Sequence, residues 1–161
     1  MQLTTDALDE HGFFDPRYTC EFDNSSPELR WENPPDGTAL FAMLAEDLDS
    51  VKTGKPFSHW VIYDIPAHIR HLPAGIPPQD ALPNGIRQGV NGLGKLGYTG
   101  PCPPLQDRPH HYAFRLFALR AGIGTIPNRV TADQLLEAIQ PFTIETAEVR
   151  GSYGRAVRKV G

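Results

Sequence analysis

Turn-forming residues occur along the whole chain, and this restricts the possible folds more than any other feature. The 161 residues include 16 prolines and 15 glycines, while helical periodicity is clear in only one segment. Proline interrupts helices, and both residue types favour turns. Many turns between short strands are typical of all-β or mostly β domains. Because this length suits one domain, we predict a single β-rich domain over residues 1–161.

Five segments have the composition of strands: residues 28–32, 38–47, 57–65, 110–120 and 146–153. The segment 38–47 is apolar on both faces, which is typical of a central strand covered on each side. The rest of 1–38 and the proline-punctuated stretch 66–88 are predicted to be irregular. Residues 89–109 form a glycine- and proline-rich loop, and ordered loops of this length are often functional.

Only one helix is predicted, and it begins at Thr131. Thr131 and Gln134 have the Thr-x-x-Gln spacing of a capping box. Leu135, Leu136 and Ile139 follow on one apolar face, and Pro141 ends the segment.

Charge and cysteine content bear on partners and compartment. The net charge is −4 and no basic cluster is present, so nucleic acid and anionic membrane surfaces are not expected partners. The longest apolar stretch, 39–45, is too short for a transmembrane segment, and the first residues lack the pattern of a secretion signal. Two cysteines do not make a disulfide framework, so Cys20 and Cys102 are expected to be reduced thiols in a cytoplasmic protein.

Polar, titratable residues stand at the ends of three apolar strand faces. Side chains alternate with period two along a strand. This alternation places Asp47 on the face of residues 41, 43 and 45, and Asp49 continues that face if the chain stays extended. His110 and Tyr112 share a face with Phe114 and Leu116. His59 is placed with Phe57, Val61 and Tyr63.

Such polar groups are costly to bury alone, so a shared pocket would let them satisfy one another and leave donors for a ligand. The alternatives are purely structural roles: His59 would be a hydrogen-bonded core histidine, and Asp49 would stabilise a turn. The glycine pattern at 92–97 matches a dinucleotide fingerprint but lacks the helix that should follow, so no cofactor is predicted.

Four motifs occur in order along nearly the whole chain: Ser26-Pro-Glu-Leu-Arg-Trp31, Asp47-x-Asp49, His59-Trp60-Val61 followed by Ile65-Pro66, and Gly100-x-x-Pro-Pro104 with Pro109-His-His-Tyr112. With these motifs the chain resembles the phosphatidylethanolamine-binding proteins, especially the bacterial Raf kinase inhibitor-like branch. The resemblance implies two antiparallel β-sheets packed as a sandwich, with a few short peripheral helices. It also implies a homodimer.

The same resemblance implies a small pocket for phosphate-like groups. Its residues fall on Asp47, His59, His110 and Tyr112, with Gly100 and the turn Pro103-Pro104 on the rim; Asp49 is included as a second carboxylate. The family pattern Asp-Pro-Asp-x-Pro reads here Asp47-Leu48-Asp49-Ser50-Val51, so both prolines beside the pocket are missing.

The expected ligand is phosphate or a phosphoethanolamine-type headgroup. The two histidines, the phenol and backbone N–H groups of the loop would supply donors. Asp47 would lie behind a histidine, where it fixes the tautomer and favours the imidazolium. The expected role is ligand binding and regulation, not catalysis, because no serine or cysteine has a recognisable nucleophile setting.

Two other classes stay open. Asp47, His59 and His110 contain the donor types of a metal-binding triad, although no local His-x-His or Glu-x-x-His pair supports one. The family resemblance also implies an interaction module that restrains a protein kinase or a protease by docking.

Overall fold

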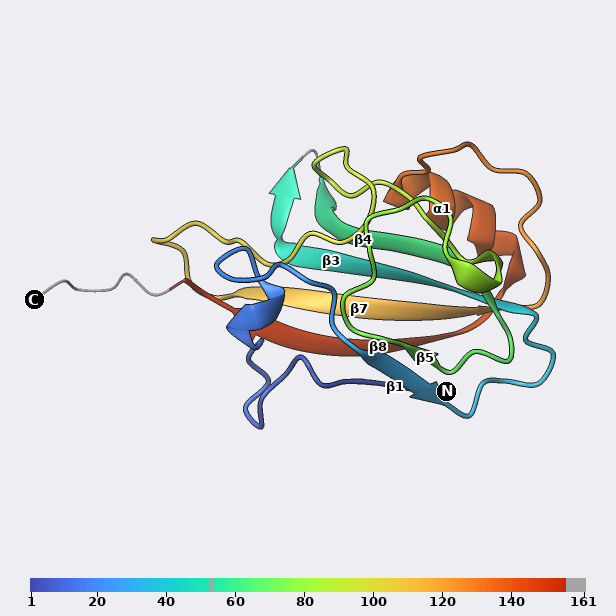
Figure 1. Ribbon diagram of the computed structural model, residues 1–161, viewed down its shortest axis with the longest axis horizontal. Helices are drawn as coiled ribbons and strands as arrows, with labels where there is room; N and C mark the ends of the chain where they lie inside the picture. Colours follow the sequence, from blue (N-terminus) through green and yellow to red (C-terminus); the bar gives the residue numbers. More distant parts are fainter. Residues whose placement is uncertain (53, 156–161) are drawn as a thin grey trace, which may run out of the picture.

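The chain forms two antiparallel sheets in a computed structural model that describes residues 1–52 and 54–155 (Figure 1). The three-stranded sheet has the order β1-β2-β5, and the five-stranded sheet has the order β6-β4-β3-β7-β8. The strands of the smaller sheet are β1 (Gln2–Thr5), β2 (Leu29–Glu32) and β5 (His71–Leu72). Those of the larger sheet are β3 (Leu40–Lys52), β4 (Lys55–Pro66), β6 (Arg87–Gln88), β7 (His110–Leu119) and β8 (Thr143–Tyr153).

Helical structure is short and peripheral. The α-helix α1 spans Ala132–Ile139, and 3-10 turns occupy Pro16–Tyr18, Pro83–Gly85 and Gln140–Phe142. Thr131 caps α1 as predicted: its hydroxyl accepts from the Gln134 N–H, and the Gln134 side chain accepts from the Thr131 N–H. The sequence-based prediction of a mostly β fold with two antiparallel sheets and few helices is confirmed.

The main core lies between the two sheets. Strand β2 alternates strictly, so Leu29 and Trp31 are buried while Arg30 and Glu32 are exposed. The Trp31 ring meets the Phe41 ring of β3 edge to face, with centroids 5.5 Å apart. Such aromatic contacts stabilise a core beyond the area that they bury.

A second core layer lies on the other face of the large sheet, under α1 (Figure 1). Leu135 and Ile139 of α1 pack there with Leu44 of β3 and Val61 of β4, and all four are buried. Strand β3 is therefore apolar on both faces because each face is covered, as the sequence predicts.

Three strands differ from the sequence prediction. β1 lies in a region expected to be irregular, and β5 and β6 lie in the proline-punctuated connection. Each of β5 and β6 has only two residues, which is too short for a periodic pattern. β1 exists through its pairing with β2, from Gln2 opposite Glu32 to Thr5 opposite Leu29.

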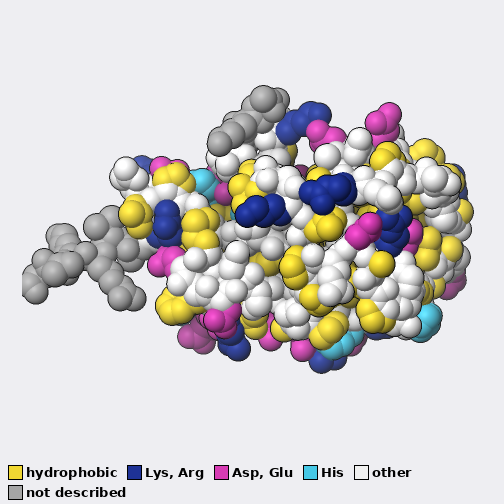
Figure 2. Space-filling model, turned by 45° about the horizontal axis from the view of Figure 1, so that its top comes forward, with side chains coloured by type: hydrophobic (Ala, Val, Ile, Leu, Met, Phe, Trp, Pro, Cys, Tyr) yellow, Lys and Arg dark blue, Asp and Glu magenta, His cyan; other side chains and the backbone are white. Residues whose placement is uncertain are grey.

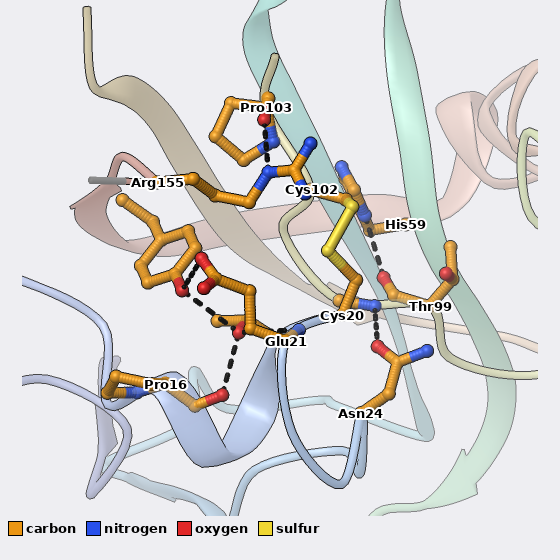
Figure 3. The surroundings of a disulfide bond; sticks show 12 residues. Pro16, Cys20, Glu21, Asn24, His59, Thr99, Cys102, Pro103 and Arg155 are labelled. Atoms are coloured by element: carbon orange, nitrogen blue, oxygen red, sulfur yellow. Dashed lines mark hydrogen bonds between the residues drawn. A yellow bond between two sulfur atoms is a disulfide. The ribbon is translucent and has the colours of Figure 1, made fainter. Parts of the chain in front are cut away.

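The prediction of reduced cysteines is wrong: Cys20 and Cys102 form a disulfide across 82 residues of sequence. Figure 3 shows the N-terminal segment that carries Cys20 and Asn24 joined to the loop that carries Thr99 and Cys102. The spacing of the two cysteines gives no sign that these segments meet. Disulfides are typical of oxidising compartments. The cytoplasmic location therefore loses one of its arguments and stays a prediction.

The distribution of charged side chains on the surface agrees with the net charge of −4. In Figure 2, basic and acidic side chains are interspersed on the visible face and form no extended basic patch. Across residues 1–52 and 54–155, no helix has the length and apolar character needed to cross a bilayer.

Candidate ligand-binding site

The structure brings four of the predicted site residues together at one end of the large sheet. Asp47 comes from β3, His59 from β4, and His110 and Tyr112 from β7. The Tyr112 ring centroid lies 5.4 Å from that of His59 and 6.4 Å from that of His110. All four residues are buried. The two imidazoles therefore lie against the same phenol, on the face of the large sheet that meets the small sheet.

A β-bulge decides the direction of His59. Ala45 pairs with Trp60 and Glu46 pairs with Ser58, so His59 is an extra residue on β4. Alternation alone placed His59 with Val61 and Tyr63, which pack in the layer under α1. The placement with Val61 and Tyr63 is wrong, because a bulge re-aims a side chain. The placement with Phe57 is confirmed, since the Phe57 and His59 ring centroids lie 4.8 Å apart. His59 instead contacts Tyr112 on the opposite face of the sheet.

Asp47 holds a bend in β3 and also orients a histidine. Its Oδ1 accepts from the backbone N–H groups of Asp49 and Ser50, at 2.9 and 3.0 Å. Its Oδ2 lies 2.7 Å from Nδ1 of His110. The missing family prolines would fall at Leu48 and Val51, and neither position supplies these two N–H groups. The carboxylate can therefore fix the bend without proline.

His110 lies between two carboxylates. In addition to the Asp47 contact at Nδ1, its Nε2 lies 2.9 Å from Oδ2 of Asp107. Burial by itself lowers the pKa of His110, but the hydrogen bonds to Asp47 and Asp107 outweigh burial and raise the pKa. Two carboxylate partners favour the imidazolium, in which both ring nitrogens are donors.

His59 has the opposite electrostatic character. Burial lowers its pKa, and the contact with Thr99 only partly opposes this effect. Its Nδ1 lies 2.7 Å from the Thr99 carbonyl oxygen (Figure 3). Because a carbonyl only accepts, Nδ1 carries the hydrogen, and in the neutral ring Nε2 carries the lone pair. Both histidines therefore supply an N–H donor, but His59 uses that of Nδ1 on Thr99, and in the neutral ring Nε2 is an acceptor.

The Tyr112 hydroxyl is buried and, among the residues that the structure describes, has no hydrogen-bond partner. It borders a cavity of about 10 Å³, whose other lining includes Phe14, His59, Tyr98 and Pro101. A volume of this size holds about one water molecule. Burial, the charge of Asp47 and a weak contact of the hydroxyl with the Asp47 carboxylate raise the pKa of Tyr112, so the phenol keeps its proton and stays a donor. This contact does not have the geometry of a full hydrogen bond.

Asp49 lies on the outer side of the site. Its Oδ2 accepts from the backbone N–H of His111 at 2.6 Å and contacts the His111 ring at 2.8 Å. These hydrogen bonds, the backbone one first, lower the pKa of Asp49. Asp49 thus ties the end of β3 to the start of β7. It also borders an open depression of about 450 Å³, together with Asp107 and His110.

The predicted rim residues serve mainly to hold the loop. A Cβ on Gly100 would lie 2.1 Å from the Tyr18 carbonyl oxygen, so only glycine fits there. The Gly100 N–H donates to the Asn24 side chain at 2.6 Å and is therefore not free for a ligand. The buried Pro103 accepts from Arg155 through its carbonyl, at 2.7 Å (Figure 3). Pro104 is exposed, and its carbonyl accepts from the Asp107 N–H at 3.1 Å.

Sequence reasoning missed two residues of the site. Asp107 was not selected, although it stands three positions before His110 and carries the only carboxyl group of the loop 100–109. Phe14 was not selected either, and its ring meets the Tyr112 ring edge to face at 5.7 Å. Nothing in the sequence places the N-terminal segment of Phe14 against β7.

The metal alternative finds no support in this geometry. Over residues 1–52 and 54–155, no three His, Cys, Asp or Glu side chains are grouped as ligands of one ion. Nδ1 of His110 is hydrogen-bonded to Oδ2 of Asp47, and Nδ1 of His59 is hydrogen-bonded to the Thr99 carbonyl, so these nitrogens are already engaged.

Comparison with known proteins agrees with the motifs. Residues 4–154 match the family described as phosphatidylethanolamine-binding protein. A UPF0098 protein of Methanothermobacter thermautotrophicus is 37% identical over 155 residues, covering 96% of this chain and 99% of that protein. UPF0098 protein YbcL of Escherichia coli is 36% identical over 138 residues, covering 84% of this chain and 75% of that protein.

Solved structures show the same relationship. The crystal structure of Escherichia coli YbcL, described as a new member of the mammalian PEBP family, has a TM-score of 0.84 at 33% identity and covers 95% of this chain and 97% of that chain. A putative phosphatidylethanolamine-binding protein homologue, CT736 of Chlamydia trachomatis, has a TM-score of 0.83 at 31% identity and covers 96% and 97%. The chain belongs to the phosphatidylethanolamine-binding protein family.

Proposed function

We propose that this protein is a regulatory ligand-binding protein whose pocket takes phosphate or a phosphorylated headgroup such as phosphoethanolamine. The observation that carries the proposal is the buried Tyr112 hydroxyl, which in the described part of the chain has only a weak contact with Asp47 and no hydrogen bond of normal geometry. An unpaired buried polar group costs free energy, so such a group at a pocket points to a ligand that completes it.

The polar groups around Tyr112 suit a protonated oxyanion. His110 Nε2 and the Tyr112 hydroxyl are donors for P–O⁻ oxygens, and the positive charge on His110 compensates the anion. Neutral His59 offers an acceptor, which suits a P–OH group. Hydrogen phosphate and phosphate monoesters carry both kinds of oxygen, whereas sulfate near neutral pH has no hydroxyl. The site should therefore favour phosphate over sulfate.

Binding without chemistry is the role that these side chains favour. Both cysteines are joined in the disulfide, so no thiolate nucleophile is available in the oxidised protein. His110 already has both ring nitrogens on carboxylates, so it is poorly placed as a general base.

Titration with phosphate and phosphoethanolamine, followed through the imidazole NMR signals, tests this proposal. We expect the His59 and His110 signals to shift, with a weaker response to sulfate. His110→Ala should abolish binding while the domain stays folded. His68→Ala is the matched control, because His68 is exposed beyond the far end of β4. Unmoved signals of both site histidines at saturating phosphate would refute the proposal.

Docking to a protein kinase or a protease is the second candidate function. The observation in its favour is that Leu105 is 49% exposed on the same loop as Asp107, and that Phe13 is 46% exposed beside that loop. Exposed apolar side chains next to a polar pocket are typical of interaction sites. Capture of a kinase or protease that weakens with Leu105→Ser, but not with Leu93→Ser in the separate turn at 91–95, would support docking.

A further inference from the structure

We propose that Asp107 is an internal ligand of the pocket: its carboxylate takes the place of the incoming anion at His110, and a bound anion must displace it. The proposal rests on the proposed function, because it concerns how the same site is regulated. Asp107 and the segment 104–109 would then cover an anion site and move away when the anion binds.

Only one ring nitrogen of His110 can serve a ligand. Nδ1 is engaged by Asp47, which is buried and also holds the backbone N–H groups of Asp49 and Ser50. Nε2 is the remaining donor, and it is occupied by Asp107 at 2.9 Å. A carboxylate oxygen on an imidazolium N–H makes the same charge-assisted hydrogen bond as a phosphate oxygen would make. The two anions therefore compete for one donor.

The Asp107 carboxylate is held far less firmly than that of Asp47. Its side chain is 45% exposed, whereas the Asp47 side chain is 6% exposed. Within residues 1–52 and 54–155, His110 is its only hydrogen-bond partner. The pair is exposed only on its Asp107 side, so a ligand can replace this carboxylate more easily than the buried carboxylate of Asp47.

The loop around Asp107 is anchored to the rest of the domain before the segment 104–109 begins, and Asp107 itself makes the contact with His110. The disulfide holds Cys102, and Arg155 donates to the Pro103 carbonyl. The residues from 104 to 109 are all exposed, and beside them lies the open depression of about 450 Å³. Movement of this segment would uncover Nε2 of His110 on the side of that open depression, where there is room for a phosphate.

Removal of the internal carboxylate should therefore tighten anion binding. Asp107→Asn keeps the shape and removes the charge, and Asp107→Ala removes both. We expect inorganic phosphate to bind each variant about tenfold more tightly than the unchanged protein, the scale of one partly exposed charge-assisted hydrogen bond. Calorimetry at about pH 6, below the ordinary histidine pKa of about 6.5, favours the imidazolium form of His110 in all variants.

Asp36→Ala is the control, because it changes the net charge equally and lies in an exposed turn before the other end of β3. Its phosphate affinity should stay within about twofold of the unchanged protein, by the usual independence of distant sites. If the unchanged protein binds phosphate and the Asp107 variants bind no more tightly, the internal-ligand proposal fails and the proposed function stands. If no variant binds phosphate, the proposed function fails and the internal ligand fails with it.

Discussion

Removal of the Cys20–Cys102 disulfide should lower stability strongly without abolishing the fold. The bond closes a loop of 82 residues. By the loop-entropy relation, such a cross-link stabilises the folded state by about 4.5 kcal/mol, because it restricts the unfolded chain. Domains of this size are stable by about 5–15 kcal/mol, so the loss is a large part of the total.

The double variant Cys20→Ser/Cys102→Ser should still fold, because other contacts hold the same two segments together. The Cys20 N–H donates to the Pro101 carbonyl at 3.2 Å, and the Tyr98 hydroxyl donates to the Tyr18 carbonyl at 2.7 Å. These contacts do not require sulfur. The variant should therefore keep the native circular dichroism spectrum while it unfolds at lower urea concentration.

Urea unfolding of the oxidised protein, the reduced protein and the double variant measures the effect. Reduction should bring the unchanged protein close to the variant, and reductant should not change the variant. Thiol titration supplies an independent check, since the native oxidised protein should show no free thiol even after denaturation. A stability difference below about 1 kcal/mol would contradict the loop-entropy reasoning. Two titratable thiols in the unreduced protein would contradict the disulfide itself.

Two further predictions concern the pocket. Tyr112→Phe should stabilise the fold by about 1 kcal/mol, because it removes a buried hydroxyl that lacks a full hydrogen bond within the described residues, and it should weaken phosphate binding. Tyr98→Phe breaks the hydrogen bond to the Tyr18 carbonyl and should destabilise the fold by about 1 kcal/mol. Stability changes of the same sign for the two variants in urea unfolding would contradict this reasoning. The raised pKa of His110 adds stability that is complete below its unfolded pKa of about 6.5 and is lost as pH rises through the folded value. The stability advantage of the unchanged protein over His110→Gln should therefore shrink as pH rises above about 6.5, and an advantage that grows with pH would refute the assignment.

The strand prediction for β7 succeeded because the strand is regular. Its pairing with β3 runs without a shift from Leu40 opposite Leu119 to Asp47 opposite Tyr112. Period two therefore assigned His110 and Tyr112 to one face correctly. In β4 the same rule placed His59 on the wrong face, because the extra residue of a bulge depends on pairing with β3 and leaves no clear signal in the sequence.

The amino-acid sequence by itself determined the mostly β class, the longer strands, the capped helix and the family. These features depend on local composition, short-range capping and ordered motifs, which the chain carries wherever it folds. Only the tertiary structure decided that Cys20 meets Cys102, that Asp107 closes onto His110 and that the Tyr112 hydroxyl has no hydrogen bond of normal geometry within the described residues. Those contacts join separate segments or depend on exact loop geometry, because a polar group is satisfied by whatever the fold brings within about 3 Å of it.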